Sequence, residues 1–217
     1  MPRRKFGRDR LPDERDHNYP IENTPSRRLY RYWNANGWWG DQGYTSECVG
    51  YAFAHWLEDG PITHKGKAPL VSPGKIYRDA QVLDEWVGTD YDGTSIRGGA
   101  KALSSMGWVS EYQWTWDITV LINALLEQGP VVLGTNWTTG MDNWDKEGVI
   151  RAAGRTLGGH AYLANGINLK RGLIRCKNSW GRAWCRQGLF YIPIEDMEDL
   201  IHDDGEVCLA IECPKLA

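Results

Sequence analysis

Cys48 is the residue whose type and position most directly suggest chemistry. It begins an expected amphipathic helix and follows Gln42 by six positions, in the stretch DQGYTSECVGYAFAHWLEDG. A thiol is a nucleophile only as the thiolate, and a helix N-terminus supplies partial positive charge and free N–H groups that stabilise this anion. A buried structural cysteine is the commoner kind, but it needs no such position. The placement therefore favours a nucleophilic Cys48.

A nucleophilic thiol needs a base, and His160 is the best candidate among the five histidines. His55 lies seven residues after Cys48 on the same helix, roughly 10 Å away at about 1.5 Å per residue, which is beyond hydrogen-bond reach. His160 follows two glycines and begins the expected strand HAYLANGIN, where small neighbours let a ligand come close. By itself such a histidine is more often a packed residue.

The third group is Asn178, which ends an expected strand eighteen residues after His160. If the two strands pair, the amide comes beside the imidazole, and Trp180 can shield their hydrogen bond from water. Cysteine, histidine and asparagine in this order form a nucleophile, a base and a group that orients the base.

Helices are expected first along the chain and strands afterwards. The first helix has apolar residues at i, i+3, i+4, i+7 and i+8 from Val49, with Ser46 as its expected cap and Gly60-Pro61 as its end. Further helices are expected around 73–84, 95–105 and 117–128. Short apolar runs separated by Gly, Asn and Asp then predict strands: PVVLGTNW, GVIRAA, HAYLANGIN, GLIRCKN, GLFYIPI and EVCLAIE. This order predicts an α+β fold.

Composition limits the function classes. The chain has 217 residues, 24% of them charged, and a net charge of −3, so it has no general attraction to nucleic acid. We find no apolar run of membrane-spanning length and no secretion signal, and we expect a cytoplasmic protein. Basic residues gather at the N-terminus and acidic residues at 195–206. The basic stretch is interpreted as a solvated tail in preference to a nucleic-acid-binding arm.

The five cysteines do not indicate a metal site. Cys208 and Cys213 lie on opposite faces of an expected strand, where they chelate a metal poorly. An odd number leaves at least one free thiol, and a reducing compartment is favoured. No metal or other cofactor is expected. The cysteines are Cys48, Cys176, Cys185, Cys208 and Cys213.

At these motifs the sequence resembles the papain family of cysteine peptidases. The resemblance covers roughly residues 38–214. It implies a papain-like two-lobed fold, with a helical lobe at about 41–112 and a β-barrel-like lobe at about 113–217 facing across a cleft. Residues 1–22 would be an N-terminal arm before a peptidase domain at 23–217. The matching segments are Gln42-Gly43 with Cys48, Gly159-His160-Ala161, and Asn178-Ser179-Trp180-Gly181 with Trp184 and Gly188.

Carried over by position, the resemblance implies a cysteine endopeptidase. Cys48 is the nucleophile, His160 the base and then the acid, and Asn178 holds the imidazole. The Gln42 amide joins the Cys48 backbone N–H in an oxyanion hole, and Cys48 and His160 rest as a thiolate–imidazolium pair. Trp180 is a supporting residue. Candidate substrate-binding residues are Gly93, Gly159, Ala161 and Cys213, the last on the floor of a specificity pocket or in a plain core position.

The sequence also departs from the family. Thr45 replaces a cysteine usual in the family, and Cys208 lacks its usual partner, so free thiols are expected. Glu47 beside Cys48 would raise the pKa of the thiol unless it points to solvent. The stretch LPDERDHNYPI resembles the leader of prokaryotic members, which indicates a bacterial or phage source.

Three questions stay open at the level of sequence. One alternative to a papain-like peptidase is another enzyme class, a different Cys–His hydrolase or acyltransferase. The other is a catalytically silent binding or structural module. The arm either covers the substrate cleft or is a disordered or surface tail. The expected partner is a peptide or protein substrate, with no nucleic acid, no membrane and a monomeric state.

Overall fold

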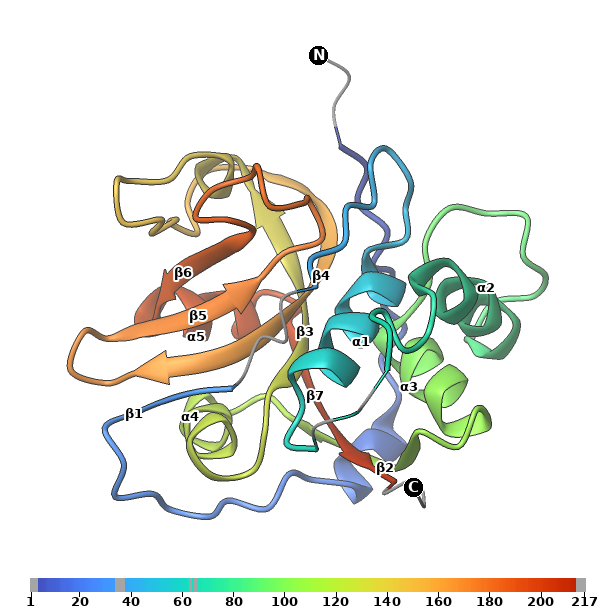
Figure 1. The fold of residues 1–217 in the computed structure, drawn as a ribbon, viewed down its shortest axis with the longest axis horizontal. Helices are drawn as coiled ribbons and strands as arrows, with labels where there is room; N and C mark the ends of the chain where they lie inside the picture. Colours follow the sequence, from blue (N-terminus) through green and yellow to red (C-terminus); the bar gives the residue numbers. More distant parts are fainter. Residues whose placement is uncertain (1–3, 34–37, 63, 65, 214–217) are drawn as a thin grey trace.

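The computed structural model describes residues 4–33, 38–62, 64 and 66–213. Three helices, α1 (Cys48–Asp59), α2 (Pro73–Leu83) and α3 (Ile96–Ser105), pack together on one side of a seven-stranded sheet. Figure 1 shows α1 against the sheet, with α2 and α3 behind it on the outer side. The predicted α+β class is confirmed. Within the described residues, no helix combines the length and the hydropathy that crossing a membrane would need.

The helix that begins at Cys48 forms where the apolar spacing predicted it. Phe53, Trp56 and Leu57 are fully buried, and the helix ends at Asp59, immediately before Gly60-Pro61. The expected cap is wrong. The N-cap position belongs to Glu47, which makes no side-chain capping bond. The first N–H groups of α1 therefore stay available to other partners.

The sheet is antiparallel, in the order β2-β7-β3-β4-β5-β6, with β1 paired to β4. Its centre is β4, which is long enough to pair with β3, β5 and β1. The strands are β1 (Tyr30–Tyr32), β2 (Val109–Thr115), β3 (Val131–Thr138), β4 (Thr156–Asn168), β5 (Leu173–Lys177), β6 (Leu189–Pro193) and β7 (Glu206–Glu212).

Five of the six expected strands exist. GVIRAA, residues 148–153, forms only isolated bridges, in which Val149 pairs with Tyr191 and Ile150 with Trp144. The elements that were not predicted are β1, β2, helix α5 (Ile194–His202) and the two short helices. The short helices are η1 (Glu14–Asn18) and η2 (Thr139–Asp142), and α4 (Ile118–Glu127) matches the expected helix at 117–128.

Two apolar cores lie on either side of β4. Ala161 and Leu163 belong to the core that contains α1, whereas Tyr162 and Ala164 belong to the core beneath the sheet. This division follows from the alternation of side chains along a strand. Because β4 contributes to both cores, the residues near its start lie at the seam between the helices and the sheet.

The N-terminal segment is not a free tail. Arg8 forms a parallel bridge with Thr94, Pro20 bridges to Trp114, and Ile21 is buried in the core beneath the sheet. In Figure 1 this blue segment descends behind α1 before it reaches η1. The expectation of a solvated tail is therefore wrong for this segment, because Arg8 and Ile21 are buried against the rest of the chain.

Candidate active site

His160 and Asn178 form the central hydrogen bond of the site. His160 lies in β4 and Asn178 directly follows β5, and the antiparallel pairing of these strands brings the side chains within 2.9 Å, Nε2 to Oδ1. Asn178 Oδ1 also accepts from the Ser179 backbone N–H at 2.8 Å, which fixes the orientation of the amide. Nε2 must therefore carry the proton. Nδ1 is buried without a hydrogen-bond partner among the described residues, so it is left as a proton acceptor.

Aromatic rings enclose the imidazole. Trp180 and Trp137 lie with ring centroids 5.0 and 5.1 Å from that of His160, and Phe6 lies edge-on at 5.7 Å. His160 is fully buried, and this burial lowers its pKa to about 4, although the hydrogen bond to Asn178 opposes the shift. In this arrangement the imidazole is neutral at physiological pH.

Cys48 is also fully buried at the N-terminal end of α1. Burial raises the pKa of its thiol to about 11, and hydrogen bonds from the backbone of Ala161, Gly7 and Val49 lower it in part. The expected thiolate–imidazolium pair is therefore not favoured in this arrangement, because both groups are shut off from water. The cause is burial, and Glu47 is not among the groups that shift this pKa.

Gln42 is tied to the segment that carries Asn178. Its backbone N–H donates to Ser179 O at 2.8 Å, and its side-chain oxygen accepts from the Ser179 hydroxyl. The side-chain Nε2 then has a fixed direction and donates to Thr45 O at 2.6 Å and to Lys5 O at 3.2 Å. Gln42 thus offers an amide N–H of fixed direction to a peptide carbonyl, which is the kind of donor that an oxyanion hole needs.

The N-terminal segment occupies the same place. The Gly7 backbone contacts Cys48, and its carbonyl accepts from the Thr94 N–H at 3.0 Å. Arg8 N–H donates to Gly159 O at 3.0 Å, and Asp9 N–H donates to Thr94 O at 3.0 Å. A cavity of about 450 Å³ remains beside this segment. Residues 4–9 line it together with Ser46, Asp92 and residues 157–159.

Three of the four candidate substrate-binding residues lie at this segment and one does not. Gly159 accepts from Arg8, Ala161 contacts Cys48, and a Cβ on Gly93 would come within 2.3 Å of the Asp9 carboxylate. Cys213 lies beyond the far end of β7, where its N–H donates to Trp108 O. The structure does not bring Cys213 together with the others.

Sequence reasoning missed Glu206, which lies at the near end of β7. Its carboxylate accepts from Arg8 Nε at 3.1 Å, and Arg8 Nη2 donates to Asp204 O at 2.6 Å. The uneven charge was the available signal, since the N-terminus is basic and residues 195–206 are acidic. The basic and the acidic region face one another only in the folded chain, so the sequence alone cannot show that they pair.

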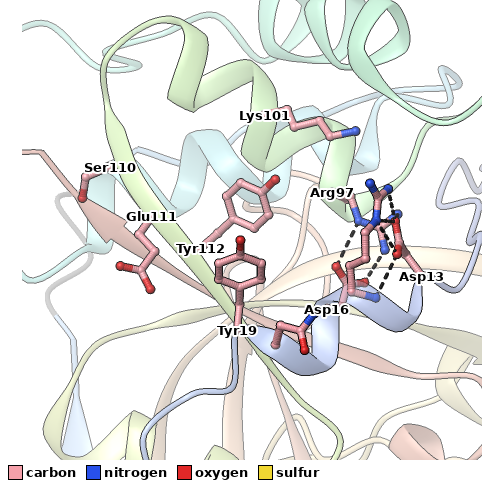
Figure 2. A pocket seen from close by; sticks show the side chains of 10 residues that line it. Asp13, Asp16, Tyr19, Arg97, Lys101, Ser110, Glu111 and Tyr112 are labelled. Carbon is pink, nitrogen blue, oxygen red and sulfur yellow. Dashed lines mark hydrogen bonds and ion pairs between the residues drawn. The ribbon is translucent and has the colours of Figure 1, made fainter.

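A second cavity, of about 540 Å³, lies elsewhere. It opens where η1 meets α3 and β2, and Figure 2 shows Tyr19 beside Tyr112 and the ion pairs of Arg97 with Asp13 and Asp16 at its edge. None of the candidate catalytic residues lines it. The ion pairs of Arg97 with Asp13 and Asp16 join the N-terminal segment to α3. No group of three metal-ligating side chains with metal-site geometry occurs within the described part of the chain.

Comparison with known proteins supports a papain-like fold. No family model matches the chain. An uncharacterized peptidase C1-like protein of Acanthamoeba polyphaga mimivirus is 24% identical over 203 aligned positions, which cover 73% of this chain and 65% of that protein. This chain therefore spans less than two thirds of the length of this relative.

Solved structures give the same result for the fold. Xylellain, a cysteine protease from Xylella fastidiosa, matches with a TM-score of 0.75 and 21% identity over 97% of this chain and 98% of its own. The proform of the ragweed pollen cysteine protease Amb a 11 matches with a TM-score of 0.67 and 20% identity, over 88% of this chain and 67% of its own. The predicted resemblance to papain-like proteins is confirmed at the level of the fold.

Proposed function

We propose that this chain is a cysteine peptidase that hydrolyses peptide bonds through Cys48, His160, Asn178 and Gln42. The observation that carries the proposal is the convergence of four separate segments. The start of α1 supplies a thiol, β4 an imidazole with one unpartnered nitrogen, the end of β5 the amide that orients it, and the loop before α1 an amide donor. The similarity to a peptidase C1-like protein supports the same activity.

In the proposed reaction, His160 Nδ1 takes the proton of the Cys48 thiol, and the thiolate attacks the peptide carbonyl carbon. The oxygen becomes negative and is stabilised by the Gln42 amide and the Cys48 backbone N–H. The tetrahedral intermediate collapses to a thioester as His160 returns its proton to the leaving amine. A water molecule, deprotonated by the same imidazole, then hydrolyses the thioester and regenerates the thiol.

The arm, defined here as residues 4–10, is proposed to block this reaction while it occupies the cleft. The carbonyl that Gln42 binds belongs to Lys5, but the peptide group at the Cys48 sulfur is the N–H of Gly7. The peptide group at the sulfur joins Phe6 to Gly7, so its carbonyl and the carbonyl that Gln42 binds are one residue out of register, and the arm is held without being a substrate. Departure of the arm would admit water, reverse the pKa shifts that burial causes, and allow the thiolate–imidazolium pair to form.

The experiment combines active-site labelling with activity measurements. We expect E-64 or iodoacetamide to modify Cys48 and to stop hydrolysis of a fluorogenic peptide amide. Cys48→Ala should abolish hydrolysis, His160→Ala should reduce it by several orders of magnitude, and Asn178→Ala should reduce it less, because Asn178 transfers no proton.

Cys185→Ala is the matched control. Cys185 is a free and partly exposed thiol outside the site, so this variant should keep native activity and native labelling at Cys48. If Cys48→Ala hydrolysed peptides at the native rate, the mechanism would be wrong. If the native chain bound peptides but never cleaved them after the arm was displaced, the chain would be a silent binding module.

A further inference from the structure

The cleft contains an acidic side-chain pocket, here called the Glu206 pocket, formed by Glu206, Asp204 and Gly134. The Arg8 side chain fills it and is only 2% exposed. Its guanidinium donates to the Glu206 carboxylate through Nε and to the Asp204 backbone through Nη2. The pocket thus holds the whole of a long cationic side chain. The residue that carries it directly follows Gly7, which contacts Cys48.

Gly134 gives the pocket its depth. It lies in β3 opposite Glu206 in β7. A Cβ at this position would come within 2.8 Å of Arg8 Nε and 2.9 Å of Glu206 Oε1. Any larger residue would therefore stand between an incoming side chain and the carboxylate.

Glu206 depends on a cation from outside the sheet. Within the described part of the chain it forms ion pairs with Arg8 and Arg10, both of which belong to the arm. Arg97, which also lowers the pKa of Glu206 through its charge, is held by Asp16 and Glu85. When the arm leaves, a buried carboxylate loses both partners, and an unpaired buried charge is costly. A basic side chain of a substrate would restore the pairing.

The position of the pocket relative to the scissile bond follows from the arm. Phe6 packs against His160 and Trp180, so the part of the cleft that it occupies is where the imidazole would protonate the leaving amine. Arg8 lies on the other side of Gly7, which contacts Cys48. The arm therefore runs through the cleft in the direction opposite to that of a substrate, and the pocket receives a side chain from the acyl part of the substrate, one residue removed from the residue at the nucleophile.

We propose that the Glu206 pocket selects substrates with arginine or lysine as the second residue before the scissile bond. This proposal rests on the proposed peptidase function and adds the substrate class. It also explains how the arm binds, because Arg8 occupies the pocket in place of the basic side chain of a substrate.

The kinetic test compares two fluorogenic amides, benzyloxycarbonyl-Arg-Arg-aminomethylcoumarin and benzyloxycarbonyl-Leu-Arg-aminomethylcoumarin. The full chain should prefer the first. In Glu206→Gln, the ratio of the two kcat/KM values should fall at least about tenfold, because a hydrogen bond to a charged group contributes that much or more. The arm competes with both substrates equally and cancels in the ratio. Gly134→Val should lower the ratio as well, without removing a charge.

Glu212→Gln is the matched control. Glu212 is a second buried acid at the opposite end of β7, where it pairs with His64. This variant should keep the native ratio. An unchanged ratio in both Glu206→Gln and Gly134→Val would overturn the proposal, even if both peptides are cleaved efficiently.

A binding measurement separates this proposal from the peptidase function. The peptide KFGRDR, which has the sequence of residues 5–10, is titrated into the full chain carrying Arg8→Ala, and KFGLDR is the comparison peptide. KFGRDR should bind at least about tenfold more tightly, and Glu206→Gln should remove the difference. Binding with this preference in a chain that cleaves nothing would support the pocket and refute the peptidase. Equal binding of the two peptides would refute the pocket.

Discussion

Gly7→Ala tests whether the arm blocks the cleft, and it does so without altering a catalytic residue. A Cβ on Gly7 would lie 1.9 Å from the backbone oxygen of Ser46, about 1 Å inside the 3.0 Å limit that real Cβ atoms respect. Ser46 is buried at the turn before α1 and cannot retreat without moving Cys48. The arm must move instead.

The size of the effect follows from the hydrogen bonds that this movement breaks. Retreat of Gly7 loses the bond from Thr94 N–H and the bond from Arg8 N–H to Gly159 O, each 3.0 Å long. At about 0.5–1.5 kcal/mol for each bond, the closed state loses about 1–3 kcal/mol. The ratio of open to closed molecules should therefore rise by about fivefold to over a hundredfold.

The arm would act as an intramolecular competitor, so the effect should appear in KM. The apparent KM is the intrinsic value divided by the open fraction, whereas kcat at saturation is that of the open enzyme. For a fluorogenic dipeptide amide, we expect kcat/KM of Gly7→Ala to rise at least about fivefold with little change in kcat. Alkylation of Cys48 by iodoacetamide should accelerate by the same factor.

Gly129→Ala is the control, because the nearest atom to its Cβ would be Pro61 Cδ at an ordinary 3.5 Å. It should leave both rates unchanged. Native values of kcat/KM and of alkylation rate in a folded Gly7→Ala protein would refute the blocking function of the arm. Deletion of residues 2–22 is a poorer test, because it also removes Ile21 from the core.

Three further predictions concern the described residues. Because burial raises the pKa of Cys48 to about 11 in the closed arrangement, alkylation of the full chain should still be increasing with pH at about pH 9. In Gly7→Ala it should level off at lower pH, and identical profiles would contradict the burial argument. Lys177→Met should cost about 3–5 kcal/mol of unfolding free energy in urea denaturation, since Lys177 and Asp59 form a fully buried ion pair. Adding Asp59→Asn should recover part of this loss, and strictly additive losses would refute the coupling. All five cysteines are free thiols in the structure, so mass spectrometry without reduction should find no quantitative disulfide, and activity should persist in strong reductant.

The sequence by itself determined the candidate chemical groups and the elements that carry them. Cys48 at a helix start follows from apolar spacing over one helix and from the break at Gly60-Pro61. The order of helices before strands predicted the fold class. These features depend on residues close together in the chain, which is why periodicity reveals them. The pairing of His160 with Asn178 was also within reach, because only eighteen residues separate them and β4 and β5 follow one another in the chain.

The sequence did not predict the elements whose stability comes from partners far away in the chain. Strand β2 exists because Val109–Thr115 pairs with β7, almost a hundred residues later, and β1 exists because Tyr30–Tyr32 pairs with the end of β4. Conversely, residues 148–153 have a strand-like composition but meet only isolated bridging partners. Local propensity is a weak guide where packing against remote segments decides the outcome.

Only the tertiary structure decided the state of the site. Helix position alone favours a reactive thiolate at Cys48, but burial beneath Gly7 and Phe6 makes the neutral thiol and the neutral imidazole the stable forms. The ionisation of a group depends on whether water reaches it, and that depends on every segment folded over it. The same holds for Arg8 and Glu206, which lie 198 residues apart in the chain. Their opposite charges pair only because the fold brings β7 and the arm together in one pocket.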